Sequence, residues 1–292
     1  MWPVFIDTDI GDDIDDALAL ALAARSPEIE LVGVSTVFGE TRQRARLAAH
    51  LLRVFERPAV PVAAGCGEPL KRRHRPSGVP QAALLDSREQ YRLSELDGPD
   101  LLLQTARTQA GRLTLLCLGP LTNLATALSR EPALIRQIAR VILMGGTSGL
   151  PWPEWNVRSD ALAARLVLTA GLPITLIGWN ITRRCQMRAQ ELTQLRAGQA
   201  ERTHLLWQLI QIWQRHRPRW HPELPYLHDP LTIVALCAPE LLTFAPTPEH
   251  VIVNGPLQGL MVPRLPHRPL IQAAIDLQVS AARSWIMQRL SE

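Results

Sequence analysis

The stretch VFIDTDIGDDIDDALAL, residues 4–20, contains the pattern that decides the fold. Residues 3–6 form a short apolar run, typical of a strand buried on both faces of a parallel sheet. Residues 15–25 follow with the pattern of a helix. Between the two apolar segments the chain concentrates six aspartates within ten residues: Asp7, Asp9, Asp12, Asp13, Asp15 and Asp16. The whole chain has a formal net charge of +4, so general acidity does not explain this cluster.

The same alternation of strand and helix continues along the chain. Further strands are predicted at 31–37, 113–119, 140–145 and 173–179, and further helices at 41–55, 121–129 and 159–170. Such alternation indicates βαβ units, and therefore an α/β fold with a mostly parallel central sheet flanked by helices. Residues 188–216, 230–237 and 270–289 are predicted to be helical. No linker or repeat interrupts the pattern, so we expect a single domain over residues 1–292.

Composition narrows the class of protein. Hydrophobic residues make up 47% and charged residues 20%, which is ordinary for a globular enzyme. No apolar run approaches the roughly 20 residues that span a bilayer, and no basic segment precedes an apolar one at the N-terminus. The four cysteines are widely spaced without a CxxC pair, as expected in a reducing compartment. We therefore expect a cytoplasmic protein without a membrane partner.

One basic run, KRRHR at residues 71–75, raises the question of nucleic acid binding. Neither interleaved aromatic residues nor a nucleic-acid motif accompanies it, so we expect a solvated loop and no nucleic acid partner.

The aspartate cluster indicates a metal site. Acidic residues near a helix N-terminus are stabilised by the helix dipole, typically by about 0.3–1 kcal/mol each, which explains one or two of the six. Six carboxylates so close together repel one another, and a bound cation removes that repulsion. Ligands that are all oxygen favour Ca²⁺ or Mg²⁺ over zinc. Because the spacing is not that of an EF-hand, other parts of the chain must complete the site.

Two other segments carry candidate residues. His228 and Asp229 precede Pro230 at a predicted helix start, where Asp229 could also serve merely as an N-cap. Glu154 and Asn156 follow the predicted strand ending in Gly145-Gly146. In extended chain these two side chains point the same way, which suits a grip on neighbouring hydroxyls.

Taken in order, these motifs resemble those of the nucleoside hydrolases, the inosine–uridine-preferring N-ribohydrolases. The likeness runs from residue 3 to about 237 and includes the aspartate motif, GPLTN at 119–123, ILMGG at 142–146, EWN at 154–156 and HD at 228–229. The resemblance implies a Rossmann-like nucleoside hydrolase fold and Ca²⁺-dependent hydrolysis of ribonucleosides to free base and ribose. It also implies a homodimer or homotetramer.

The resemblance further implies roles for individual residues. Asp9, Asp16, Asp229 and the backbone carbonyl of Leu118 would bind Ca²⁺, and Asp15 would hold a metal-bound water. Asp9 would also take the proton of the attacking water. His228 would sit near the leaving base and could protonate it, since histidine has a reference pKa near 6.5. Glu154 and Asn156 would hold ribose hydroxyls.

Departures from the family pattern concern mainly the sugar contacts. The aspartate motif is longer by two residues, which makes Asp13 a further metal ligand or a group just behind the ligands. Glu40 stands where a ribose-binding asparagine often follows Gly39, and the loop before Glu154 lacks an asparagine often found there. In the aromatic loop before His228, we expect Trp220 and Tyr226 to lie near the base and Trp213 to belong to a helix core.

Two other readings remain open from the residues alone. A phosphohydrolase of the HAD type would use Asp7 as nucleophile with Mg²⁺, although Gly11 stands where that motif expects Thr or Val. A Ca²⁺-dependent protein that binds nucleoside or ribose without turnover is the second alternative, and the Glu40 departure keeps it open.

Overall fold

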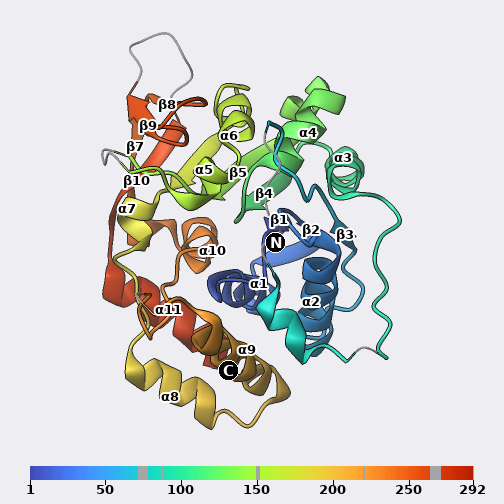
Figure 1. Cartoon of the computed structure of the whole chain (residues 1–292), viewed down its shortest axis with the longest axis vertical. Helices are drawn as coiled ribbons and strands as arrows, with labels where there is room; N and C mark the ends of the chain where they lie inside the picture. Colours follow the sequence, from blue (N-terminus) through green and yellow to red (C-terminus); the bar gives the residue numbers. More distant parts are fainter. Residues whose placement is uncertain (72–77, 87, 149–151, 220, 264–270, 292) are drawn as a thin grey trace.

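A twisted sheet of eight strands runs through the molecule (Figure 1). The computed structural model describes residues 1–71, 78–86, 88–148, 152–219, 221–263 and 271–291. The strand order is β3-β2-β1-β4-β5-β6-β10-β7, and every neighbouring pair is parallel except β10 with β7. The strands are β1 (Trp2–Thr8), β2 (Ile29–Thr36), β3 (Val62–Ala64), β4 (Leu113–Cys117), β5 (Ile138–Met144), β6 (Ile174–Ile177), β7 (Leu242–Thr247) and β10 (Ile271–Leu277). A separate hairpin pairs β8 (Glu249–Val251) with β9 (Met261–Pro263).

Helices cover both faces of this sheet (Figure 1). On one side lie α1 (Asp15–Arg25), α2 (Thr41–Val54) and α10 (Pro230–Cys237), and α9 (Glu201–His216) and α11 (Val279–Ser291) pack against these helices. The other face is packed by α3 (Gly98–Gln109), α4 (Thr122–Arg130) and α6 (Ala161–Leu168). The shorter elements are α5 (Trp155–Ser159), α7 (Trp179–Thr182), α8 (Ala189–Ala197) and the 3-10 turns η1 (Pro80–Leu84), η2 (Pro132–Arg136) and η3 (Pro239–Leu241).

Strand β1 explains why the first apolar run belongs to the centre of the sheet. Val4 and Ile6 are buried in the core on the side of α1, whereas Phe5 is buried in the core on the side of α3. Because successive side chains of a strand point to opposite faces, only a continuous apolar run satisfies both cores. The predicted α/β class with a mostly parallel sheet is thereby confirmed.

The predicted helix at 270–289 is wrong in its first half. Residues 271–277 form β10, which pairs parallel with β6 and antiparallel with β7, and α11 begins only at Val279. The side chains of Ile271, Ala273 and Ala274 are buried within this strand. Pairing with the neighbouring strands therefore overrides the weak helical preference of the sequence.

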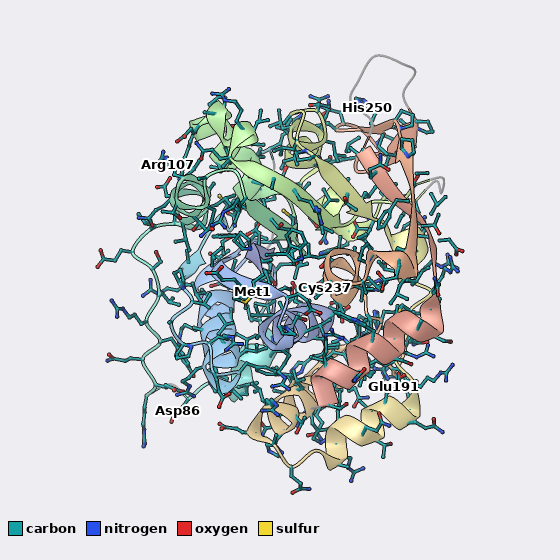
Figure 2. The ribbon with its side chains drawn as sticks, turned by 180° about the vertical axis from the view of Figure 1, so that it is seen from behind. Met1, Asp86, Arg107, Glu191, Cys237 and His250 are labelled. Atoms are coloured by element: carbon teal, nitrogen blue, oxygen red, sulfur yellow. The ribbon has the colours of Figure 1, made fainter. Side chains whose placement is uncertain are left out.

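Two smaller differences concern helix ends. The predicted helix at 188–216 is two helices, α8 and α9, separated at residues 198–200. The helix predicted at 159–170 begins at Ala161, because the Asp160 carboxylate caps α6 by accepting the Ala163 N–H at 3.0 Å. Helix α8 lies beside α11, and the Glu191 carboxylate of α8 accepts a hydrogen bond from Arg283 Nε of α11 at 2.9 Å (Glu191 is labelled in Figure 2). Over the ranges that the structure covers, no helix is long and apolar enough to cross a membrane.

Candidate active site

A cavity of about 800 Å³ opens where the parallel strands end. Its wall combines the loop after β1, Leu118 after β4, the segment after β5, the end of α9 with residues 216–218 and His221, and the residues just before α10. This edge is where ligands bind in open α/β sheets. Five of the six clustered aspartates line the cavity, namely Asp9, Asp12, Asp13, Asp15 and Asp16.

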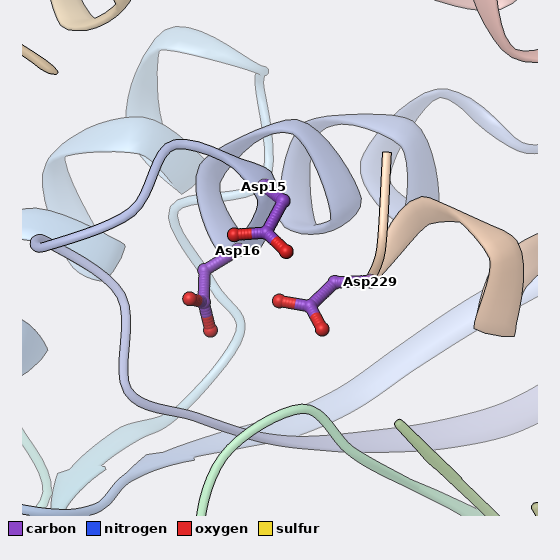
Figure 3. A group of neighbouring side chains, drawn as sticks. All are labelled: Asp15, Asp16 and Asp229. Atoms are coloured by element: carbon purple, nitrogen blue, oxygen red, sulfur yellow. The ribbon is translucent and has the colours of Figure 1, made fainter. Parts of the chain in front are cut away.

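Three carboxylates meet inside the cavity (Figure 3). Asp15 and Asp16 open α1, and Asp229 lies just before α10; one oxygen of each lies within 4.8 Å of the others. All three side chains are buried. Helices α1 and α10 pack against each other, so their N-termini bring together residues that are far apart in the sequence. Two helix N-termini at one point favour negative charge there, but three ionised carboxylates this close still repel one another.

The pKa values of these carboxyls reflect that crowding. Burial, followed by repulsion from neighbouring aspartates, raises the pKa of Asp15 and Asp229 well above the usual range. Burial also raises the pKa of Asp16 to about 6, although the Thr8 hydroxyl donates a hydrogen bond to its carboxylate and lowers the pKa. Protonation or a bound cation is therefore required to make this cluster stable.

Asp9 lies beside this group. A Cβ atom on residue 119 would lie only 2.6 Å from Asp9 Oδ1, so Gly119 leaves the space that the Asp9 carboxylate fills. Burial and the charge of Asp16 raise the pKa of Asp9 well above its usual range. Among the carboxylates that the structure describes, neither Asp9 nor Asp13 belongs to the set within 4.8 Å.

Asp13 faces a different part of the cavity. Its side chain is 41% exposed, and its Oδ2 lies 3.9 Å from His221 Nε2. Its Oδ1 accepts the N–H of Ile14 at 2.7 Å. Asp13 thus contacts His221, while its charge also contributes to the raised pKa values of Asp15 and Asp229.

Glu154 and Asn156 both line the cavity, but not for the predicted reason. Asn156 belongs to helix α5 and Glu154 is its N-cap, so the expectation of a continuous extended chain is wrong. The Glu154 carboxylate accepts the N–H groups of Asn156 at 2.8 Å, Gly146 at 2.7 Å and Val157 at 3.1 Å. Asn156 Nδ2 donates to the Leu118 carbonyl at 2.6 Å. The two side chains therefore tie together the loops after β4 and β5.

His228 lies at the cavity wall with its Nδ1 2.7 Å from Thr182 Oγ1. Burial, with a smaller contribution from His221, lowers the pKa of His228 to about 3. Its ring lies 5.2 Å from that of Tyr226, which is not itself among the cavity-lining residues.

Three other candidate residues are placed as follows. Glu40 is exposed at the start of α2 and does not line the cavity. Trp220 lies outside the described residues. Trp213 is buried in α9, as expected of a core position, and it also lines the cavity.

Sequence reasoning missed the tryptophans of the cavity rim. Trp152 and Trp155 are 61% and 57% exposed although both line the cavity, and Trp179 lies nearby with the Arg183 guanidinium 4.9 Å from its ring. Large exposed aromatic side chains at a ligand edge indicate a binding role. The signal was present in the sequence, because two tryptophans flank Glu154 in PWPEW, residues 151–155.

Comparison with known proteins identifies the fold and the family. The family model described as "Inosine-uridine preferring nucleoside hydrolase" matches residues 4–284. The chain belongs to this family. This protein is therefore an N-glycosyl hydrolase that acts on ribonucleosides. The family membership suggested by the sequence motifs is confirmed.

Sequence similarity to known relatives covers most of this nucleoside hydrolase. It is 30% identical to a probable uridine nucleosidase 2 of Arabidopsis thaliana, over 99% of this chain and 97% of the relative. It is 32% identical to the pyrimidine-specific ribonucleoside hydrolase RihA of Salmonella paratyphi A, over 82% and 81%. Among solved structures, a plant nucleoside hydrolase, PpNRh1, superposes with a TM-score of 0.89 at 27% identity, over 99% of both chains. A purine-preferring ribonucleoside hydrolase from Gardnerella vaginalis gives 0.87 at 25%, over 99% and 98%.

The alternative of a HAD-type phosphohydrolase is overturned by family and geometry together. Asp7, the nucleophile in that reading, is buried outside the cavity lining. Its Oδ1 accepts hydrogen bonds from Ser35 Oγ at 2.6 Å and Asn123 Nδ2 at 2.7 Å. The alternative of binding without turnover is likewise set aside, because the chain belongs to a family of hydrolases.

Proposed function

We propose that this nucleoside hydrolase requires Ca²⁺ to cleave the N-glycosidic bond of ribonucleosides, with release of free base and ribose. The observation that carries the proposal is the meeting of the Asp15, Asp16 and Asp229 carboxylates within 4.8 Å. Their oxygens are hard donors, and Ca²⁺ accepts six to eight such ligands in flexible geometry. The donor set therefore fits Ca²⁺, and it would be held by these three residues with Asp9 adjacent.

The cation supplies a defined part of the chemistry. When bound, Ca²⁺ offsets the carboxylate charge and helps to orient water and ribose hydroxyls at the cavity floor. Ca²⁺ acidifies water far less than zinc does, so a protein carboxylate must accept the proton.

Asp9 is our candidate for that general base. The oxygen of water forms the new bond to the anomeric carbon, the bond from that carbon to the base nitrogen breaks, and Asp9 accepts the water's proton. The Asp9 carboxylate lines the cavity beside the acidic cluster, which places a proton acceptor next to the proposed calcium site. The surrounding carboxylates also favour the positive charge that develops on the sugar.

His228 is our candidate for assisting the leaving base. With a pKa lowered to about 3, the imidazole is neutral at pH 7, so it acts as a hydrogen-bond donor through one N–H and not as an imidazolium. The contact of Nδ1 with Thr182 Oγ1 fixes the ring, which leaves Nε2 for the departing base. Hydrogen bonding at that position stabilises the negative charge that the base acquires.

We place pyrimidine ribonucleosides, uridine first, among the preferred substrates. The support is that relatives at 30% and 32% identity are a probable uridine nucleosidase and a pyrimidine-specific hydrolase. The rim tryptophans Trp152, Trp155 and Trp179 offer apolar faces to a base or sugar, and base stacking on an aromatic ring contributes about 1–3 kcal/mol.

The proposal is tested by base release from uridine, cytidine, inosine and adenosine, with and without a calcium chelator. We expect uridine to be hydrolysed fastest and every activity to disappear in the chelator and return with Ca²⁺. Hydrolysis that is unaffected by exhaustive chelation would contradict the calcium requirement, and a purine preference would contradict the substrate order.

Two further parts of the proposal concern the state of the protein in the cell. We propose a cytoplasmic location, supported by four free cysteines, Cys66, Cys117, Cys185 and Cys237, which suit a reducing compartment. We also propose a homodimer or homotetramer, on the family resemblance. Light scattering of the purified protein distinguishes these from a monomer.

A further inference from the structure

We infer that Arg44 is a positioning residue whose buried guanidinium clamps the loop after β1, so that Asp9 and the three-carboxylate group face the cavity correctly. The inference rests on the proposed function, in which these carboxylates hold Ca²⁺ and Asp9 receives the proton. No motif in the sequence marks Arg44, which lies in the second turn of α2 among other arginines.

The guanidinium donates four hydrogen bonds to loop acceptors. Arg44 is fully buried, at 0% exposure. Its Nη1 donates to the carbonyls of Asp9 and, at 2.9 Å, Ile10. Its Nη2 donates to the Asp12 carboxylate at 2.8 Å, and its Nε donates to the Phe38 carbonyl at 2.7 Å. One planar group thus fixes four acceptors, three of which belong to the aspartate loop.

Arg44 also joins two loops at the ligand edge. Phe38, after β2, adopts a φ of +69°, a conformation that non-glycine residues rarely adopt and that neighbouring structure must hold in place. Its carbonyl is bound by the same guanidinium that binds the Asp9 carbonyl. Because the fork of an arginine is rigid, the loops after β1 and β2 are held in one fixed relation.

The longer loop of this chain supplies its own anchors. Compared with the family motif that this sequence resembles, the loop carries two extra residues between Gly11 and Asp15. Within this longer loop, Asp12 pairs with Arg44, and the Asp13 carbonyl accepts a hydrogen bond from Gln81 Nε2 at 2.6 Å. Arg44 and Gln81 therefore stabilise a loop that its extra length would otherwise loosen.

Two simpler roles for Arg44 predict different results. If Arg44 only stabilised the fold, its loss would lower the melting temperature and leave calcium affinity unchanged. If it acted only as a nearby positive charge, its loss would tighten calcium binding, because like charges repel. A clamp that positions the ligands predicts the opposite sign, namely weaker binding.

The test measures calcium affinity by calorimetry, together with thermal unfolding and nucleoside kcat, in a set of variants. We expect Arg44→Met to weaken calcium binding at least tenfold, and Arg44→Lys not to restore it, because an ammonium cannot reach four acceptors in this geometry. Arg42→Met removes the same charge from an exposed position of the same helix and should leave the affinity unchanged. Asp12→Asn, at a side chain that is 38% exposed, should weaken binding about threefold without loss of the fold.

Several outcomes would overturn the inference. Wild-type affinity in both Arg44 variants, tighter binding in Arg44→Met, or full rescue by lysine would each do so. If Arg44→Met does not fold, wild-type affinity in both Arg44→Lys and Asp12→Asn would overturn it. If the wild-type protein binds no calcium, the proposed function fails separately; the Arg44 inference is then decided by kcat, which should fall at least tenfold in Arg44→Met and not in Arg42→Met.

Discussion

Gly119 is the position where a single methyl group tests the placement of the general base. In Gly119→Ala, the new Cβ would lie 2.6 Å from Asp9 Oδ1 and 2.9 Å from both Asp9 Cγ and Val37 Cγ1. Ordinary contacts of a Cβ begin near 3.4 Å. The Asp9 carboxylate, or the turn that carries residue 119, must therefore shift by the difference of 3.4 and 2.6, about 0.8 Å.

A shift of that size at a reacting group is expensive for catalysis. Displacing a catalytic group by about 1 Å can cost roughly a hundredfold in rate, and overpacking a buried site destabilises a protein by about 1–3 kcal/mol. We expect kcat on uridine to fall between about 30- and 100-fold in Gly119→Ala. The protein should stay folded, with a lower melting temperature.

The assay is steady-state release of uracil, compared with thermal unfolding of the same preparations. Gly78→Ala serves as control, because a Cβ there meets no atom within 4 Å and the variant should keep wild-type kcat. A kcat for folded Gly119→Ala within twofold of wild type would refute the reasoning that the Asp9 carboxylate must occupy this position.

Four further predictions follow from the site. Asp229→Asn should weaken calcium binding, because it changes one of the three grouped carboxylates. It should also raise the melting temperature of the calcium-free protein by a few degrees, at about 2–4 °C per kcal/mol, because it removes one of the buried carboxylates that repel each other. A lower melting temperature would contradict this prediction. Burial raises the pKa of Asp16 to about 6 and that of Asp7 to about 7, from 3.8. The stability that these groups contribute in their protonated form is therefore present below pH 4 and is lost as the pH rises through 6 and 7. The denaturant midpoint of the chelated protein should fall across that range, and a rise would count against the argument. His228→Ala should lose far more kcat on uridine than on a riboside with an activated leaving group, and equal losses would exclude assistance to the leaving base. Trp155→Ala should raise the KM for uridine about five- to tenfold if its ring stacks on the substrate, whereas Trp2→Ala, at the start of β1, should not.

The fold was predictable where one strand or helix carries its own signal. The apolar run of β1 has to satisfy a core on each face, and that requirement is visible in Val4, Phe5 and Ile6 alone. Residues 271–277 were read as part of a helix, because alanines and short apolar runs allow either state. Pairing with β6 and β7 decides the matter, and that pairing is a property of the assembled sheet.

The site was predictable in its residue types more than in its geometry. Clustered aspartates and the ordered family motifs predicted a metal site of Asp9, Asp13, Asp15, Asp16, Asp229 and the Leu118 carbonyl. Of these carboxylates, the structure brings Asp15, Asp16 and Asp229 within 4.8 Å of one another. The role of Asn156 beside Glu154 was predicted from an extended chain, whereas Asn156 belongs to a helix. Arg44 could not be found at all, because an arginine in an arginine-rich helix reads as a solvated side chain until the fold buries it.

The most direct test of the central claim is a calcium titration of metal-free enzyme in which binding and uridine hydrolysis are followed in parallel. The carboxylate geometry predicts that both signals saturate together at one ion per chain, and that Asp229→Asn needs more calcium for both. Full turnover in metal-free enzyme, or calcium bound at this group without any gain in hydrolysis, would contradict the account.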